Sequence, residues 1–167
     1  MIYVCPLSKI DETATRIGAS RMVSLLNTGT ALTRPAVIAP ENHLLLLMND
    51  IAEAQEGMTL PGEDHVRNLL DFAGTWDRAQ PLLIHCFAGI SRSTASAYIV
   101  ASALSPHRDE VELANTLRQA SPSATPNPRL IAVADDILGR GGRMVDAIRA
   151  IGRGADAFEG TPFGLNL

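Results

Sequence analysis

Short apolar runs of strand length alternate along this chain with longer stretches whose apolar residues recur at helical spacing. The runs lie at 1–6, 22–26, 44–48 and 82–84. Because 44–48 and 82–84 contain no polar residue, they predict strands buried on both faces, as in parallel sheets covered by helices. We therefore predict an α/β fold with a central, mostly parallel sheet of about four to five strands, flanked by helices.

The stretches between and after these runs predict helices. One starts at Pro61, and the apolar residues after it recur every three or four positions. Another start is Asn127, a capping residue, followed by Pro128, which suits the first helical position. The remaining helices are expected over 11–19, about 93–104, 108–119 and around 144–151.

The length of 167 residues fits one domain with a substantial buried core. Hydrophobic residues make up 46% and charged residues 19%, which is typical of a packed globule. We expect a single domain over 1–151. The tail, 152–167, carries Phe158, Phe163, Leu165 and Leu167. Since free tails seldom hold so much apolar area, we expect it to dock on the domain.

Composition excludes several classes of protein and partner. Two cysteines cannot build a disulfide framework. The net charge of −4 and the lack of a basic cluster argue against binding nucleic acid or anionic membranes. No apolar run approaches the roughly 18 residues of a membrane span. With no basic-then-apolar signal segment at the start, the expected location is the cytoplasm.

The segment 85–93 carries the candidate chemistry, since it links the apolar run 82–84 to a predicted helix. Such a loop aims several backbone N–H groups at one point, and the helix dipole adds positive potential. Gly89 permits a sharp backbone turn. Arg92, at the helix start, can donate two parallel hydrogen bonds to an anion. The segment therefore predicts a cradle for a tetrahedral oxyanion beyond the carboxyl end of a strand.

Cys86 stands at the mouth of this cradle. The positive potential of a helix N-terminus favours a thiolate, and a thiolate facing bound phosphate is a nucleophile. The alternative is a buried cysteine in a simple connection, which is common for free cysteines. The joint pattern of strand, His85-Cys86, five residues, Arg92-Ser93 and helix favours the nucleophile.

This segment resembles the signature of the protein tyrosine phosphatases. The full string from His85 to Ser93, His-Cys-Phe-Ala-Gly-Ile-Ser-Arg-Ser, is similar to that of the dual-specificity branch in a compact, bacterial-type form. Asn49-Asp50 resembles the general-acid loop of that branch. The stretch 121–127 resembles the segment that braces its phosphate loop. The resemblance covers roughly residues 1 to 140, and it leaves the tail unmatched.

The resemblance implies a role for each matching residue. Cys86 would take the phosphoryl group as a phosphocysteine, and Arg92 would bind that group. Ser93 would stabilise the leaving thiolate. His85 would tune the loop by hydrogen bonding, and Asn127 would support it, beside its reading as a helix cap. The remaining donors would come from the backbone of Phe87, Ala88, Gly89, Ile90, Ser91 and Arg92.

Expulsion of an alkoxide or phenoxide requires a proton donor opposite the nucleophile. Asp50 is the preferred candidate, because it ends a predicted strand that can neighbour 82–84 and reach the same end of the sheet. Glu53 and Glu56 are the alternatives. The other upstream acids are expected to be helix-capping or solvated; they are Glu63, Asp64, Asp71 and Asp77.

The predicted function is a cysteine-dependent phosphomonoester hydrolase, a protein-tyrosine or dual-specificity phosphatase that needs no cofactor and no metal. A loop with Phe87, Ala88 and Ile90 but no lysine is unlike the basic loops of phosphoinositide phosphatases, so a phosphotyrosine protein is the expected substrate. Phosphoserine or phosphothreonine, small phosphorylated metabolites and phospholipids are the alternative substrates. The alternatives are a rhodanese-like sulfurtransferase and a non-catalytic module that binds phospho-ligands.

The remaining cysteine and histidines lack the spacing of a metal site. We expect Cys5 to be a small buried side chain, with a redox disulfide to Cys86 as the less favoured alternative. His43, His65 and His107 are expected to be exposed or to cap helices.

Overall fold

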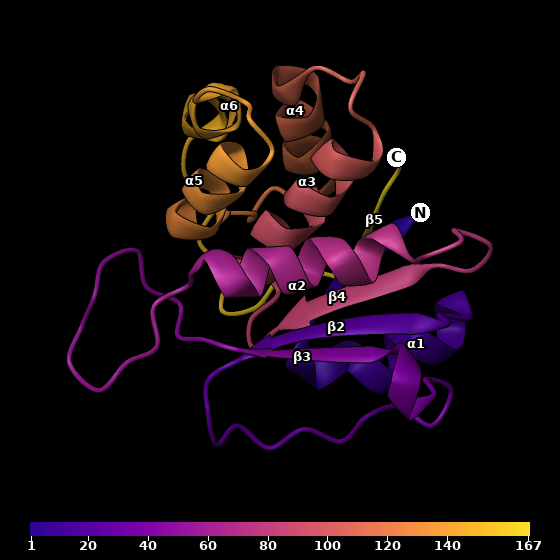
Figure 1. The fold of residues 1–167 in the computed structure, drawn as a ribbon. Helices are drawn as coiled ribbons and strands as arrows, with labels where there is room; N and C mark the ends of the chain where they lie inside the picture. The colour runs from indigo at the N-terminus through magenta and orange to yellow at the C-terminus, as the bar shows by residue number, and fades with distance from the viewer.

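The computed structural model describes all residues, 1–167, as an α/β fold built on one five-stranded sheet (Figure 1). The strand order is β3-β2-β4-β1-β5. The first four strands pair in parallel, and only β5 runs antiparallel, to β1. The predicted mostly parallel sheet is confirmed. The strands are β1 (Ile2–Pro6), β2 (Arg21–Leu26), β3 (His43–Leu47), β4 (Leu82–Cys86) and β5 (Phe163–Leu165).

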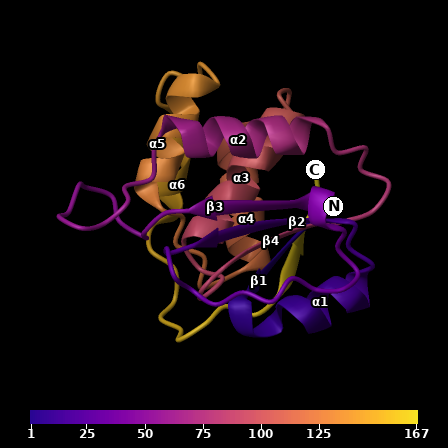
Figure 2. The same ribbon diagram turned by 60° about the horizontal axis from the view of Figure 1, so that its bottom comes forward.

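Helices cover both faces of the sheet, and most of them gather on one (Figures 1 and 2). α1 (Ile10–Ile17) lies on the opposite face from all the others. Short 3₁₀ turns, Leu7–Lys9 and Pro40–Asn42, precede α1 and β3. The crowded face carries α2 (Glu63–Gly74), α3 (Arg92–Leu104), α4 (Glu110–Ala120), α5 (Pro128–Ile137) and α6 (Arg143–Ile151).

Local sequence signals explain most helix ends. Several observed ends differ by one or two residues from the predicted bounds. α1 ends at Gly18, whose φ of 63° is left-handed. α2 starts after Gly62 instead of at Pro61. α4 starts after Asp109, whose carboxylate accepts hydrogen bonds from two backbone N–H groups of the first turn. The predicted Asn127 cap of α5 is confirmed, because its side chain accepts from the N–H groups of two following residues.

β4 and α3 form the centre of the molecule. Every residue of β4 is buried, and β4 continues two residues past the apolar run 82–84 to include His85 and Cys86. α3 is buried along most of its length, which is typical of a helix enclosed by others. The larger core cluster lies between the sheet and the crowded helical face, and a smaller cluster lies under α1.

The prediction that 44–48 is buried on both faces was wrong. Leu45 is 45% exposed and Leu47 is 40% exposed, whereas Leu46 packs into the larger core. β3 is an edge strand, and only the face towards α2 is covered, because α1 packs at the far side of the sheet near β1 (Figure 2). β3 also pairs with β2 and not with β4, contrary to the expected neighbourhood of the two strands.

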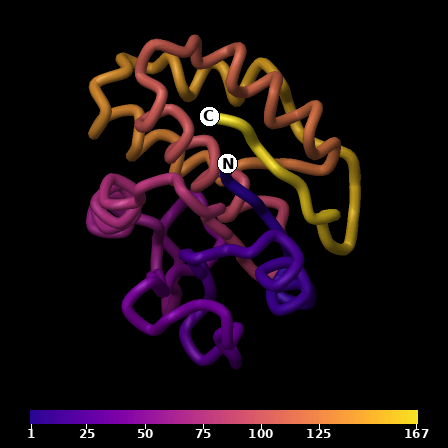
Figure 3. The backbone as a smooth tube through the Cα atoms, turned by 90° about the vertical axis from the view of Figure 1, so that its right-hand side faces the viewer, coloured from indigo at the N-terminus to yellow at the C-terminus, as the bar shows by residue number.

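The tail, 152–167, crosses the molecule from the end of α6 to the free edge of β1. There β5 pairs with β1, so that Ile2 lies opposite Leu165, and the two chain ends come together (Figure 3). Phe163 and Leu165 are buried. Phe158, expected to add apolar contact, is instead 92% exposed, since it stands in an irregular turn before β5.

No helix of this structure combines the length and the apolar character that spanning a bilayer requires.

Candidate active site

The segment 85–93 lies at the carboxyl end of the sheet, between the central strand β4 and the N-terminus of α3. Cys86 is the last residue of β4, and Arg92 is the first residue of α3. Five residues connect them, so the N–H groups of the loop and of the first helical turn converge near the cysteine. The expected order of strand, loop and helix is therefore present.

The loop is fixed by close packing against the end of β1. Gly89 has a φ of +70°, and a Cβ there would lie 2.7 Å from the Pro6 nitrogen and 2.8 Å from the Cys5 carbonyl carbon. The Leu7 N–H donates to the Phe87 carbonyl over 3.1 Å. A side chain at position 89 would thus push the loop away from β1, which explains the glycine.

Cys86 is buried, with 2% of its surface exposed, and its thiol has one polar neighbour. The Cys86 Sγ lies 3.1 Å from the Ser93 Oγ, and Ser93 is itself fully buried in the first turn of α3. A hydroxyl at this distance can donate a hydrogen bond to a thiolate, and so it can stabilise the negative charge on the sulfur.

Arg92 is held by acceptors from two other segments. Its Nη1 donates to the Met48 carbonyl over 2.7 Å and to the Asn27 Oδ1 over 2.8 Å. The side chain is buried, and its Nε has no hydrogen-bond partner. One nitrogen thus anchors the guanidinium, and the Nε keeps a buried donor that has no acceptor in the chain.

The roles of Asn27 and Met48 were missed by sequence analysis. Both follow strands, β2 and β3, that end on the same side of the sheet as β4. The rule that ligands lie beyond the carboxyl ends of parallel strands is the signal that points to such residues.

Asp50 is brought to the loop, although β3 is not a neighbour of β4. Its Oδ1 accepts hydrogen bonds from the Ser91 Oγ at 2.7 Å and from the Asn127 Nδ2 at 2.8 Å. Asn127 at the same time caps α5 through its Oδ1, so the same side chain both caps the helix and holds Asp50. With both donors on Oδ1, the Oδ2 of Asp50 is the oxygen left for other partners.

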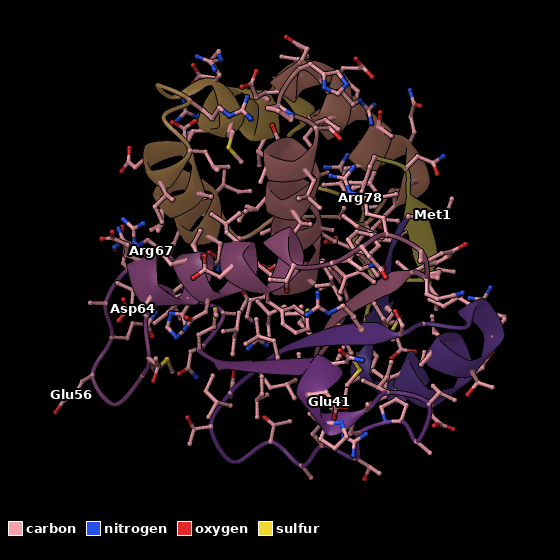
Figure 4. All side chains as sticks on the ribbon, turned by 45° about the vertical axis from the view of Figure 1, so that its right-hand side comes forward. Met1, Glu41, Glu56, Asp64, Arg67 and Arg78 are labelled. Atoms are coloured by element: carbon pink, nitrogen blue, oxygen red, sulfur yellow. The ribbon has the colours of Figure 1, made fainter.

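The other acidic candidates lie elsewhere. Glu56 stands at the tip of a loop that projects from the body, away from the sheet (Figure 4). Glu53 is exposed in the same loop. Glu63 pairs with Arg67 on the surface of α2. Of the upstream acids, Asp50 is the one that hydrogen-bonds to the loop carrying Cys86.

A groove of about 370 Å³ opens beside Asp50. Ser91, Asn127 and the tail segment 153–157 are among the residues that line it. The tail is tied to the loops at this place: the Gly160 N–H donates to the Ala88 carbonyl over 2.7 Å. The rim of the candidate site is therefore built partly by the stretch that follows α6.

His85 lies on the face of the sheet opposite the thiol and is fully buried. Its Nε2 is 2.6 Å from the Ser24 Oγ, which is also 2.8 Å from the Nε2 of His43. Burial is the main cause that lowers the pKa of His85, to about 4, so the ring is neutral near pH 7. The expectation that His43 is exposed or a cap was wrong, because it is half-buried on β3 and bonded to Ser24. His65 does cap its helix, accepting from the Gly62 N–H.

The two cysteines are both free and buried, and they lie on opposite faces of the sheet. Cys5 is opposite His85 in the register and belongs to the small core under α1, whereas Cys86 belongs to the large core. Burial raises the pKa of the Cys5 thiol to about 12. A disulfide between them would have to pass through the sheet, which argues against the redox alternative.

The sequence matches no known family profile and no curated protein. Solved structures do match. DUSP15 superposes with a TM-score of 0.66 at 18% identity, covering 90% of this chain and 89% of its own. Human DUSP28 superposes with a TM-score of 0.63 at 14% sequence identity, and the match covers 90% of this chain and 94% of DUSP28. The human tyrosine phosphatase-like serine/threonine/tyrosine-interacting protein superposes with a TM-score of 0.64 at 14% sequence identity. That match covers 84% of this chain and 92% of the other protein. The chain has the fold of the dual-specificity branch of the protein tyrosine phosphatase superfamily.

Proposed function

We propose that this chain is a cysteine-dependent phosphomonoester hydrolase of the protein-tyrosine or dual-specificity type. The observation that carries the proposal is one loop that brings together three groups. They are the Cys86 thiol beside Ser93, the buried Arg92 with an unpartnered Nε, and Asp50 bonded to Ser91. A nucleophile, an anion-binding donor and an acid are the parts that phosphoryl transfer to cysteine needs.

In the first step, Arg92 and the loop N–H groups hold the three non-bridging oxygens of the phosphoryl group. The Cys86 thiolate attacks phosphorus in line, forming a P–S bond while the bond to the leaving oxygen breaks. Asp50 gives its proton to that oxygen. Because the Oδ1 of Asp50 accepts two hydrogen bonds, we assign the transferred proton to its Oδ2.

In the second step, the phosphocysteine is hydrolysed. Asp50, now ionised, takes a proton from a water molecule, and the water oxygen attacks phosphorus as the P–S bond breaks. The electron pair returns to Cys86, and the Ser93 hydroxyl at 3.1 Å stabilises that thiolate by a hydrogen bond. The products are inorganic phosphate and the starting enzyme. Every group in both steps belongs to the chain, the substrate or water.

The groove beside Asp50 supports a protein substrate. It is lined by Ile90 and Ser91 of the loop and by Asp50, and its volume of about 370 Å³ has room for residues that flank a phosphorylated side chain. Phe87, 59% exposed, offers an aromatic surface for a phenyl ring. We propose a phosphotyrosine protein as the substrate, and we count the tail, 152–167, as part of the catalytic domain because it lines this groove.

Two other functions use the same anion cradle. A sulfurtransferase needs no acid, so the two hydrogen bonds that hold Asp50 at the loop favour the phosphatase. A binding module is a real alternative within this fold, since one similar structure carries a name that says only phosphatase-like. A binding module, however, needs neither the thiol nor Asp50.

Hydrolysis of para-nitrophenyl phosphate tests the proposal. Cys86→Ser should lower kcat by at least about a thousandfold, as removal of a nucleophile does in other covalent enzymes. Cys5→Ser is the matched control, because it changes the other buried cysteine on the opposite face and should keep activity. Rapid quenching with a ³²P-labelled substrate should trap label on Cys86.

Three results would contradict the proposal. Turnover by Cys86→Ser would exclude the cysteine mechanism. Phosphate binding without hydrolysis of any aryl phosphate would identify a binding module. Thiosulfate turnover without phosphatase activity would identify a sulfurtransferase.

A further inference from the structure

Four carbonyl oxygens of the loop that follows Cys86 are hydrogen-bonded to the segments around it. Each bond comes from a backbone N–H of another part of the chain, with nitrogen–oxygen distances from 2.7 to 3.3 Å. The donors and acceptors are Leu7 to Phe87, Gly160 to Ala88, Thr125 to Ile90 and Asn127 to Ser91. The peptide groups of the loop are therefore held from outside it.

These bonds fix the direction of the N–H groups that follow each carbonyl. The chain has no cis peptide bond, so the carbonyl of one residue and the N–H of the next point in opposite directions. A carbonyl that is held by an outer segment turns the next N–H away from that segment, towards the centre of the loop. None of these N–H groups donates to an acceptor of the chain; they belong to Ala88, Gly89, Ser91 and Arg92. They are therefore free to bind an anion there.

Gly160 is the one donor of the four that lies in the tail, 152–167. The resemblance to the phosphatases ends near residue 140, so it does not account for this donor. The bond from Gly160 to the Ala88 carbonyl, at 2.7 Å, is the shortest of the four. It orients the peptide group that ends in the Gly89 N–H. Gly89 is buried, and a buried N–H is costly to leave without an acceptor, so a ligand that accepts from it gains affinity.

The contact between the tail and the loop is close and fixed. A Cβ at Gly160 would lie 2.8 Å from the Gly89 oxygen, just as a Cβ at Gly89 would lie 2.7 Å from the Pro6 nitrogen. The tail is tied down on both sides of this contact. The Ser8 Oγ donates to the Glu159 Oε2 over 2.8 Å, and β5 then pairs with β1 (Figure 3). Gly89 is thus packed against both the end of β1 and the tail.

We propose that Gly160 is a positioning residue of the anion cradle: its N–H holds the Ala88 carbonyl and so turns the Gly89 N–H towards a bound phosphoryl group. The tail then strengthens anion binding without touching the anion. Gly160 acts through backbone geometry alone, because it brings neither a side chain nor a charge. The choice of a phosphoryl group as the anion rests on the proposed function, and the test below therefore uses inorganic phosphate without any turnover.

Binding of inorganic phosphate to the full chain gives the first measurement. Gly160→Pro has no N–H to donate, and Gly160→Ala places a Cβ against the Gly89 oxygen. Both should bind phosphate about 10- to 100-fold more weakly than wild type, the contribution of one hydrogen bond to a charged group. Gly164→Ala is the matched control in the same tail. Its Cβ would meet the Met1 Sδ and the Tyr3 Cε1, each at 3.1 Å, and not the loop, so it should bind as wild type.

Backbone amide NMR separates a positioning role from a general loss of structure. In the wild-type protein, phosphate should shift the ¹H–¹⁵N signals of Ala88, Gly89 and Ser91. At saturating phosphate, Gly160→Ala should lose most of the shift at Gly89. The shifts at Ala88 and Ser91 should remain, because their peptide groups are held by donors outside the tail. The wild-type measurement needs no variant, so it tests the inference even if the substituted chains do not fold.

Three results would overturn the inference. They are wild-type phosphate affinity in both Gly160 variants, an equal loss of affinity in Gly164→Ala, and a wild-type Gly89 signal that phosphate does not shift. Phosphate binding with the expected Gly89 shift, but without hydrolysis of para-nitrophenyl phosphate, would refute the proposed function and leave this inference standing. Hydrolysis with an unmoved Gly89 signal would refute the inference and leave the phosphatase standing.

Discussion

Arg92 owes its orientation to residues that no local pattern connects with it. Its Nη1 is shared between the Met48 carbonyl and the Asn27 side chain, and the amide of Asn27 adds nothing else to the site. Removing that amide should loosen the guanidinium without removing its charge. Such a change should therefore lower the affinity for an anion more than it lowers the stability of the fold.

We expect Asn27→Ala to weaken binding of inorganic phosphate by about tenfold. Hydrogen bonds to charged groups contribute about 1.5–3 kcal/mol, and the bond to Met48 keeps part of the orientation. The inhibition constant of phosphate measures the change. Asn115→Ala, at an exposed asparagine of α4, is the control and should bind as wild type. Equal affinities in the two variants would show that Met48 alone orients Arg92.

Variants of Asp50 and Glu53 test which of these two carboxyl groups protonates the leaving oxygen. Asp50→Ala should lower kcat for substrates with poor leaving groups by about 10²–10⁴-fold, the usual contribution of general acid catalysis. For aryl phosphates with good leaving groups the loss should be much smaller. Glu53→Gln should leave both rates near wild type, because Glu53 makes no bond to the loop. A leaving-group series read out by kcat decides this, and a uniform loss across the series would remove Asp50 from the acid role.

The loop itself depends on its contact with the end of β1. Gly89 and Gly29 both have left-handed φ values, +70° and +83°, but only Gly89 is crowded: no atom would lie within 4 Å of a Cβ at Gly29. The two glycines therefore separate backbone strain from displacement of the loop.

Gly29→Ala should cost about 1–2 kcal/mol of unfolding free energy, the price of a left-handed alanine. Gly89→Ala should cost more, and it should also abolish phosphate binding, since its Cβ would meet the Pro6 nitrogen at 2.7 Å. Urea unfolding and phosphate titration measure the two effects. Full phosphate affinity in Gly89→Ala would mean that the loop does not need its contact with β1.

The elements that sequence patterns predict well are those whose signal is local. The apolar run of β4, the cap at Asn127 and the glycine-containing loop are read from neighbouring residues. The edge position of β3 is not, because a run of leucines looks the same at the centre of a sheet and at its edge. β5 is only three residues long, which is too short for alternation to show.

The site divides in the same way. The spacing of Cys86, Arg92 and Ser93 lies within one segment and was predictable. The order of the strands brings Asn27 and Met48 to Arg92, and it brings Ser24 and His43 to His85. That order depends on how the whole sheet assembles. The prediction for Asp50 gave the right end of the sheet, but it assumed that β3 neighbours β4, whereas β3 pairs with β2.

For the molecule as a whole, buried His85 links stability to pH. Its pKa is lowered from 6.5 to about 4, so the stabilisation that the fold gains from a neutral His85 is fully present above pH 6.5. As the pH falls from 6.5 through about 4, the unfolded chain binds a proton that the folded chain resists, and stability is lost. The loss from this one residue is about 3 kcal/mol.

Urea unfolding at pH 7 and at pH 4 measures this loss. His85→Gln should be less stable than wild type at pH 7, but its stability should fall less between the two pH values. Parallel pH dependence in the two proteins would show that His85 is not the group responsible.

The pairing of β1 with β5 also sets an order in time. Ile2 meets Leu165, so the second strand partner of β1 does not exist until residues 163–165 have been made. At about 5–20 residues per second, β1 waits roughly 10 to 30 s on the ribosome with that edge unpaired. The contact from Gly160 to Ala88 arrives just as late. A nascent chain therefore lacks a brace of its anion cradle until synthesis of this stretch is complete.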